Sequence, residues 1–212
     1  MKDAYKTIAH PTLGEFRDRG SKFIAQLFPM SSELTFAEWM SKSKTEHPKS
    51  RHHCYAYRLN NGMERLSDDG EPSGSAGRPI MNRLYSAEIV DVGCIVVRYF
   101  GGTKLGVPGL INAYKSVTQD ALTKVDVIQR YLTEEIQVSF DYAQMGRLMD
   151  VLKQLGLVVS KTDLGLHPTL AYEARLSQSA DSIRKIKAKM LGRSLDDIED
   201  DTMVPGVRFP DH

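Results

Sequence analysis

The sequence predicts a two-domain α+β protein, divided into residues 1–130 and 131–212. The first observation is that residues 1–130 alternate short apolar runs with loops rich in glycine, serine and proline, as in strands and helices joined by tight turns. The second is that the pattern changes near residue 131 to the order strand, helix, strand, strand, helix. That order predicts a compact, ferredoxin-like α+β domain at the C-terminus.

Composition supports a globular chain. Of its 212 residues, 41% are hydrophobic and 26% are charged, which is enough for one large core or two small ones. No apolar run approaches the roughly 20 residues of a membrane helix, and the start MKDAYKTIAH lacks the apolar core of a secretory signal. We therefore expect a cytoplasmic protein with no membrane partner.

The formal net charge of +1 conceals an asymmetry between the two halves. Residues 1–130 carry a net charge of +4, and residues 131–212 carry −3. Neither half is a strongly basic nucleic-acid module. Any contact with phosphate must therefore come from a local cluster of charges, because the overall field is weak.

The elements of the N-terminal half follow from local patterns. Residues 14–28 are expected to form two strands around a polar turn, where Gly20 supplies the backbone freedom that the turn requires. A helix should begin after Ser32, whose hydroxyl can cap it, and should end before Pro48. The remaining predictions are a strand with two alternating faces, a short helix, a buried strand and an amphipathic helix, at residues 51–59, 79–87, 94–100 and 108–124.

The C-terminal half has a simpler pattern. Asp141 is a candidate cap for the first helix. We expect three strands and two helices, the strands at residues 134–140, 157–163 and 169–176 and the helices at 142–156 and 180–191. The acidic, proline-containing tail from residue 195 should be mobile or add a late strand at best.

The segment GGTKLGVPG, residues 101–109, is the first candidate site. A glycine-rich turn between a strand and a helix can place backbone N–H groups around an anion, and Lys104 would supply a positive charge. The spacing fits neither the P-loop nor the GxGxxG fingerprint. The alternative is a tight turn whose glycines adopt positive φ, and both interpretations stay open. The candidate binding residues here are Gly101, Gly102, Lys104, Gly106 and Gly109.

The segment RLSDDGEPSGSAGRPI, residues 65–80, is the second candidate. Its carboxylates resemble a site for a hard cation, but the alternating acids of an EF-hand loop are missing. A solvated acidic turn, followed by a Ser/Gly stretch that caps the next helix, is the favoured interpretation. We therefore predict no metal and no cofactor, and assign the loop to partner binding through Asp68, Asp69, Glu71 and Ser73.

Arg98 places a charge inside an apolar strand two residues before the glycine-rich turn. Because an unpaired buried guanidinium is costly, we expect it to pair with an acid such as Asp68 or Asp69, or to open onto the same cleft as Lys104. Arg98 therefore joins the candidate anion- or partner-binding residues.

Histidine and cysteine do not complete a site in this sequence. Cys54 and Cys94 lie in apolar strand-like runs and are expected to be reduced, buried thiols. Because neighbours on a strand point to opposite faces, at most His52 and Cys54 could share a ligand, too few for zinc. No catalytic residue is assigned.

Four blocks occur in order across residues 21–115: SKFIA, HHCYAYRL, SDDGEPSGSAGRPI and VVRYFGGTKLGVPGLINAY. Together they resemble the YigZ/IMPACT family, and the layout resembles its bacterial two-domain members. The resemblance implies an N-terminal domain of the ribosomal-protein type, which also occurs in elongation factor G, and a ferredoxin-like C-terminal domain. Eukaryotic relatives regulate translation, so the implied role is translation-associated. Family members often have glycine where this chain has Pro108, which removes one N–H donor.

Three functional hypotheses remain. The leading one is a non-catalytic regulator or accessory factor that binds RNA, the ribosome or a translation protein through a surface cleft formed by both loops. The alternative is an enzyme acting on a phosphorylated small molecule, in which the glycine-rich loop holds phosphate and the acidic loop holds Mg²⁺ or acts as a base. In the third, both loops only pack an interface. The sequence does not indicate an oligomeric state.

Overall fold

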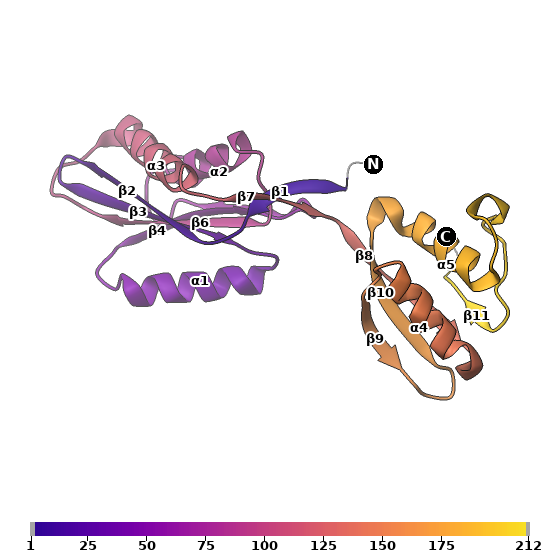
Figure 1. The fold of residues 1–212 in the computed structure, drawn as a ribbon. Helices are drawn as coiled ribbons and strands as arrows, with labels where there is room; N and C mark the ends of the chain where they lie inside the picture. Colours follow the sequence, from indigo (N-terminus) through magenta and orange to yellow (C-terminus); the bar gives the residue numbers. More distant parts are fainter. Residues whose placement is uncertain (1–2, 211–212) are drawn as a thin grey trace. The chain divides into compact units, whose positions relative to one another are not determined.

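The structure, a computed structural model, describes residues 3–210 (Figure 1). The chain divides into two compact units, one of Tyr5–Arg130 and one of Tyr131–His212 with Met1–Ala4. The outer limits of the predicted domains, residues 1 and 212, lie outside the described residues. Both units combine helices with antiparallel sheets, which confirms the predicted α+β class.

A five-stranded antiparallel sheet forms the centre of the N-terminal unit, in the order β2-β3-β6-β4-β5. In that order its strands are Thr12–Asp18, Ser21–Pro29, Val92–Tyr99, His52–Arg58 and Glu64–Ser67. One helix, α1 (Glu33–Glu46), covers one face, and α2 (Gly77–Ser86) and α3 (Gly106–Leu122) cover the other (Figure 1). β1 (Ala4–Ile8) and β7 (Val127–Tyr131) pair in a separate two-stranded sheet.

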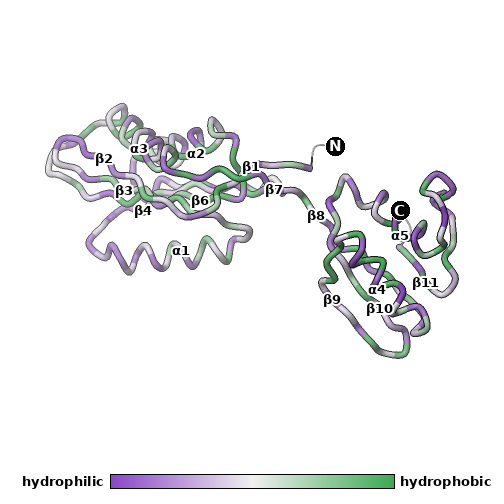
Figure 2. The backbone as a smooth tube through the Cα atoms, viewed as in Figure 1, coloured by the Kyte–Doolittle hydropathy of each residue, from purple (hydrophilic) through white to green (hydrophobic). Residues whose placement is uncertain are grey.

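Both faces of the central sheet are buried, as the side chains of β4 illustrate. Its predicted alternation is confirmed, since Cys54 and Ala56 belong to the core beneath α2 and α3, whereas Tyr57 belongs to the core beneath α1. The α1 side is an aromatic layer, in which the rings of Phe28 and Trp39 stack with centroids 4.5 Å apart. Figure 2 shows α1 as mostly hydrophilic, so a few large rings on this helix provide its attachment.

Of the two helix caps predicted from the sequence, Ser32 and Asp141, only the first is observed. The Ser32 hydroxyl accepts a hydrogen bond from the backbone N–H of Thr35 at 3.3 Å, which confirms it as the cap of α1. In the C-terminal unit, a 3₁₀ turn at Tyr142–Gln144 precedes α4, and the Asp141 side chain makes no capping hydrogen bond to it. The prediction of an Asp141 cap is therefore wrong.

The C-terminal unit follows the chain order β-α-β-β-α-β, the order of a ferredoxin-like module. Its four strands lie in the order β11-β8-β10-β9, at Val207–Arg208, Thr133–Phe140, Thr169–Arg175 and Val159–Asp163. Helices α4 (Met145–Gln154) and α5 (Ser179–Leu191) bury their apolar sides against this sheet. The tail contributes the short strand β11, which pairs with β8, so the late strand is the outcome observed.

The glycine-rich turn packs directly on the turn between β2 and β3. A Cβ atom added at Gly101 would lie 1.9 Å from the carbonyl carbon of Gly20 and 2.1 Å from the backbone nitrogen of Ser21. The Gly101 N–H also donates to the Ser21 hydroxyl at 3.1 Å. Gly102 differs, because it has a φ of +89° with open space where a Cβ would stand. The two neighbouring glycines are therefore required for different reasons.

Gly101→Ala and Gly102→Ala form a matched pair that tests this difference. Gly101→Ala should lower the free energy of unfolding by about 3 kcal/mol or more, because the methyl group meets backbone that cannot move aside. Gly102→Ala should cost only about 1–2 kcal/mol, the strain of an alanine at positive φ. Urea denaturation measures both values, and equal costs would contradict the close approach at Gly101.

Candidate functional site

Asp68 holds the acidic loop against the start of α2. Its Oδ1 accepts hydrogen bonds from the backbone N–H groups of Ala76 and Gly77 at 2.9 and 2.8 Å, and its Oδ2 accepts from Gly74 at 2.8 Å. Burial acts to raise the pKa of this carboxyl, but the three backbone donors outweigh it, and the pKa lies below its usual value. Asp68 thus satisfies the otherwise unpaired donors at the helix start.

Asp69 joins the same loop to the start of β4. It adopts a positive φ of 40°, and its Oδ2 accepts from the backbone N–H of His53 at 2.6 Å. Its carbonyl oxygen lies 2.7 Å from Nδ1 of His52. Asp69 remains exposed, as does Ser73 farther along the loop. The predicted solvated acidic turn is therefore anchored to the sheet at one end and to α2 at the other.

Glu71 turns inward and accepts two hydrogen bonds on one carboxylate oxygen. Oε1 lies 2.6 Å from Nη1 of Arg98 and 2.9 Å from the hydroxyl of Tyr114 on α3. Both ends of the ion pair are buried, so the interaction is little screened by solvent. Arg98 therefore pairs with an acid of this loop, as predicted, but the acid is Glu71 and not one of the two named examples, Asp68 and Asp69.

The pair belongs to a larger buried network made of Cys54, Glu71, Arg98 and Tyr114. The Cys54 thiol lies 3.2 Å from the Tyr114 hydroxyl and 3.0 Å from the carbonyl oxygen of Asp68. Burial raises the pKa of Cys54 to about 12, so this thiol is an inert donor and not a nucleophile. Burial, with the neighbouring Cys54 and Glu71, also raises the pKa of the Tyr114 hydroxyl.

The buried network ties together the elements on either side of the glycine-rich turn. Arg98 lies at the end of β6, just before the turn, and Tyr114 lies on the helix that follows it. Because Glu71 contacts both, the acidic loop fixes the base of the turn through one carboxylate. This link is buried, so a common surface cleft for the two loops stays a prediction.

The tip of the glycine-rich turn is exposed above this base. Gly102 and Gly106 have φ values of +89° and +72°, and Gly109 lies close to the Cβ atom of Leu105. Lys104 is exposed at the tip. The glycines thus shape the turn while the lysine ammonium is free to meet solvent or a ligand, so the two interpretations from the sequence are compatible.

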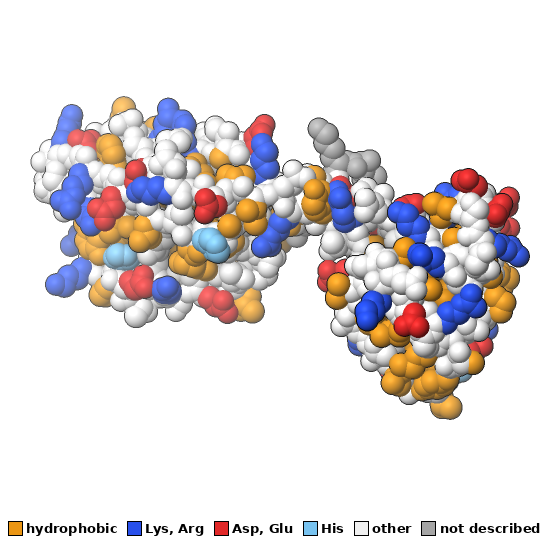
Figure 3. Space-filling view, viewed as in Figure 1, with side chains coloured by type: hydrophobic (Ala, Val, Ile, Leu, Met, Phe, Trp, Pro, Cys, Tyr) orange, Lys and Arg blue, Asp and Glu red, His pale blue; other side chains and the backbone are white. Residues whose placement is uncertain are grey.

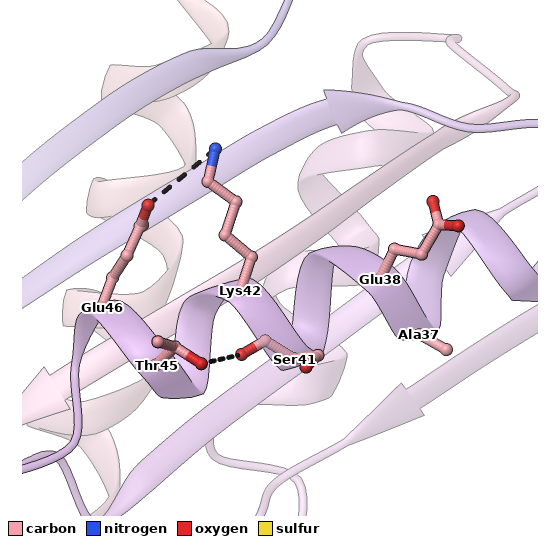
Figure 4. Close-up of a pocket in the computed structure, with 6 residues that line it drawn as sticks. All are labelled: Ala37, Glu38, Ser41, Lys42, Thr45 and Glu46. Atoms are coloured by element: carbon pink, nitrogen blue, oxygen red, sulfur yellow. Dashed lines mark hydrogen bonds and ion pairs between the residues drawn. The ribbon is translucent and has the colours of Figure 1, made fainter.

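A second surface feature lies on α1. A depression of about 640 Å³ is lined by Ala37, Glu38, Ser41, Lys42, Thr45 and Glu46. All six residues come from one helix, and Lys42 pairs with Glu46 across one turn (Figure 4). A surface with a single wall cannot enclose a ligand, so we do not treat it as a site.

The comparisons with known proteins agree with the four sequence blocks at residues 21–115 and with the fold. Residues 19–122 match the Impact N-terminal domain. IMPACT family member YvyE of Bacillus subtilis (strain 168) is 35% identical over 156 residues, which are 73% of this chain and 72% of that relative. The chain belongs to the IMPACT family.

Two further comparisons extend this result. IMPACT family member YigZ of Escherichia coli (strain K12) is 31% identical over 138 residues, 63% of this chain and 68% of that relative. A crystal structure described as that of a hypothetical protein superposes with a TM-score of 0.75 at 25% identity, and covers 91% of this chain and 93% of its own. This member of the family therefore shares its α+β fold with a solved structure along most of the chain.

Sequence reasoning missed two members of the buried network as site residues. Cys54 is the buried thiol that the sequence predicts, and Tyr114 lies buried on the predicted amphipathic helix, but the sequence links neither to the acidic loop. The available signal was the charge of Arg98 inside an apolar strand, which requires a buried counter-charge. Within residues 3–210, no group of three or more His, Cys, Asp or Glu residues is placed to hold a metal ion. None of the described helices is long and apolar enough to span a membrane.

Removing one charge of the buried ion pair should destabilise the N-terminal unit. Glu71→Gln keeps an acceptor for Tyr114 but leaves the Arg98 guanidinium buried without a counter-charge, and should cost about 3–5 kcal/mol of unfolding free energy. Adding Arg98→Met should restore part of that loss, because the uncompensated charge is gone. Urea denaturation of both variants tests this, and a double variant less stable than Glu71→Gln would contradict it.

Asp68 should make stability depend on pH in the acid range. Because its pKa is depressed in the folded state, its contribution is present above the unfolded pKa of about 3.9 and is lost as the pH falls through the folded pKa. Asp68→Asn should cost about 1–3 kcal/mol at neutral pH, since one amide cannot accept all three N–H groups. The difference in unfolding free energy between this variant and the unmodified protein should become smaller below about pH 4. A difference independent of pH would contradict the assignment.

Proposed function

We propose that this protein is a non-catalytic, translation-associated accessory factor that contacts RNA, the ribosome or a translation protein through the tip of its glycine-rich turn. Membership of the IMPACT family supports the association with translation. A role of this kind is cytoplasmic. In this role the exposed tip of the turn would contact the partner, and the buried network would hold the turn in position.

One observation carries the proposal: a cation and an aromatic ring are both exposed on a turn with a fixed base. Lys104 is exposed, and Phe100, which begins the turn, is 57% exposed. The Arg98 guanidinium lies 5.6 Å from the Phe100 ring centroid. An exposed aromatic ring and an exposed cation on one turn are a combination that single-stranded nucleic acids can use, with a base stacked on the ring and a phosphate at the cation.

The buried network makes the turn suitable for binding. Glu71 links Arg98, on the strand before the turn, to Tyr114, on the helix after it, so the turn has less conformational entropy to lose when a partner binds. Gly102 and Gly106 present bare backbone at the tip, which lets a bulky ligand approach closely. Glu71 and Arg98 would then act on the partner indirectly, by positioning the turn.

The alternative, an enzyme acting on a phosphorylated small molecule, is less well supported. It would take its metal ligand or base from Asp68, Asp69 or Glu71. Each of these carboxylates already accepts at least one hydrogen bond of 2.9 Å or shorter from the protein. Catalytic use would therefore break contacts that organise the fold, and no observation favours it.

Lys104→Ala tests the proposal. Purified ribosomes and a short single-stranded RNA serve as probes, with binding measured across a series of salt concentrations. The variant should bind more weakly, and its log-affinity against log-salt slope for the RNA should fall by about 0.7 because one phosphate contact is lost. Its melting temperature should be unchanged, since Lys104 is exposed.

The matched control is Lys44→Ala, which removes an exposed lysine from α1 on the opposite face of the same sheet. It should leave binding as it is. If Lys104→Ala keeps the unmodified affinity and salt slope for both probes, the turn is architecture alone and the proposed function is wrong.

A further inference from the structure

We propose that the groove between α2 and α3 binds single-stranded RNA and continues the contact that begins at the glycine-rich turn. The inference rests on the proposed function and adds a second, separate set of residues to it. The groove has a volume of about 340 Å³, and its lining includes Gly74, Arg78, Asn82, Arg83, Ile111 and Lys115. Apart from Gly74, which lies in the acidic loop, these residues come from the two helices on one face of the sheet (Figure 1).

The groove is positively charged in a protein that is otherwise nearly neutral. Three of its lining side chains are cations, and no acidic side chain lines it. On the face drawn in Figure 3, basic and acidic side chains are interspersed over the N-terminal unit. A local cluster of this kind is what a phosphate contact requires in a chain with a formal net charge of +1.

Helical spacing separates the three cations along the groove, two on α2 and one on α3. Arg78 and Asn82 are four residues apart on α2, and Ile111 and Lys115 are four apart on α3, so each pair lies on one side of its helix. At 1.5 Å per residue, Arg78 and Arg83 are about 7.5 Å apart along the α2 axis. Separated cations suit a polymer with repeating charges better than a single phosphate ion.

The groove also leads back to the glycine-rich turn. Lys104 lies two residues before α3 begins at Gly106, and Lys115 lies on the third turn of that helix. The helix rises about 13 Å from Gly106 to Lys115. At the stacked spacing of about 3.4 Å per nucleotide, that length corresponds to about four nucleotides. A single RNA strand could therefore contact the turn and the groove together.

The side chains favour RNA over an acidic protein segment. A docked peptide helix needs a row of apolar side-chain pockets for its anchors, whereas only two apolar residues, Pro79 and Ile111, line this groove. The Asn82 amide can donate to and accept from base edges or ribose hydroxyls. Arginine offers a planar fork that matches phosphate, and Nη1 of Arg83 is already oriented by Oε1 of Gln119 at 3.1 Å.

The test compares two double variants of the full chain. Arg78→Ala/Lys115→Ala removes two exposed cations from the groove, and Lys44→Ala/Lys49→Ala removes two exposed cations from α1 and the segment after it. Binding of a short fluorescein-labelled oligouridine is followed by anisotropy across a salt series. The groove variant should bind more weakly, with the salt slope reduced by about 1.4 for two lost phosphate contacts. The control variant should match the unmodified protein, and both should keep its melting temperature.

The outcomes separate this inference from the proposed function. If Lys104→Ala weakens binding and the groove variant does not, the groove proposal is overturned and the role of the turn stands. Polyglutamate serves as an acidic peptide competitor. If it displaces the RNA, and if the groove substitutions lower its affinity more than they lower the affinity of oligouridine, the groove is a protein-binding surface and the RNA assignment is overturned. If the unmodified protein binds neither oligouridine nor ribosomes at low salt, both proposals fail.

Discussion

The buried ion pair between Glu71 and Arg98 is the interaction on which the N-terminal unit depends. Its two charges cannot remain buried unless they meet, so the acidic loop must fold inward over the end of β6. Tyr114 adds a third contact from α3 to the same carboxylate. One polar junction therefore positions a loop, a strand and a helix that an entirely apolar core would leave less specifically arranged.

The arrangement divides the charged residues of the two loops between support and surface. Asp68 and Glu71 direct their carboxylates at backbone donors and at Arg98, while Lys104 lies outside with Phe100. Two of the three acids in the acidic loop are therefore directed inward, while the lysine of the glycine-rich turn is exposed. Asp68 and Glu71 are thus held by partners inside the unit, whereas Asp69 remains exposed.

Much of the fold could be predicted from the sequence, because strong periodicity and capping are local signals. The alternation in β4 and the apolar repeat of α3 placed those elements correctly. The short strands β1, β5 and β7 were missed, since none has a clear apolar alternation. The partner of Arg98 was also missed, because the backbone reverses at Asp69 and Gly70, both at positive φ, and no sequence pattern shows which acid is then turned inward. The groove between α2 and α3 was not predicted, because it depends on how the two helices pack and not on the sequence of either one alone.

The close approach of Gly101 to Gly20 has a consequence for the order of folding. This contact and the Glu71 junction join segments that are far apart along the chain, including a hydrogen bond between positions 80 residues apart. Long-range contacts of this kind form late, after the loop-closure entropy has been overcome by the sheet. The turn therefore acquires its final shape only when the whole unit is assembled, so a nascent or partly unfolded chain would not present it. A partner that recognises this turn would therefore bind only the fully folded N-terminal unit.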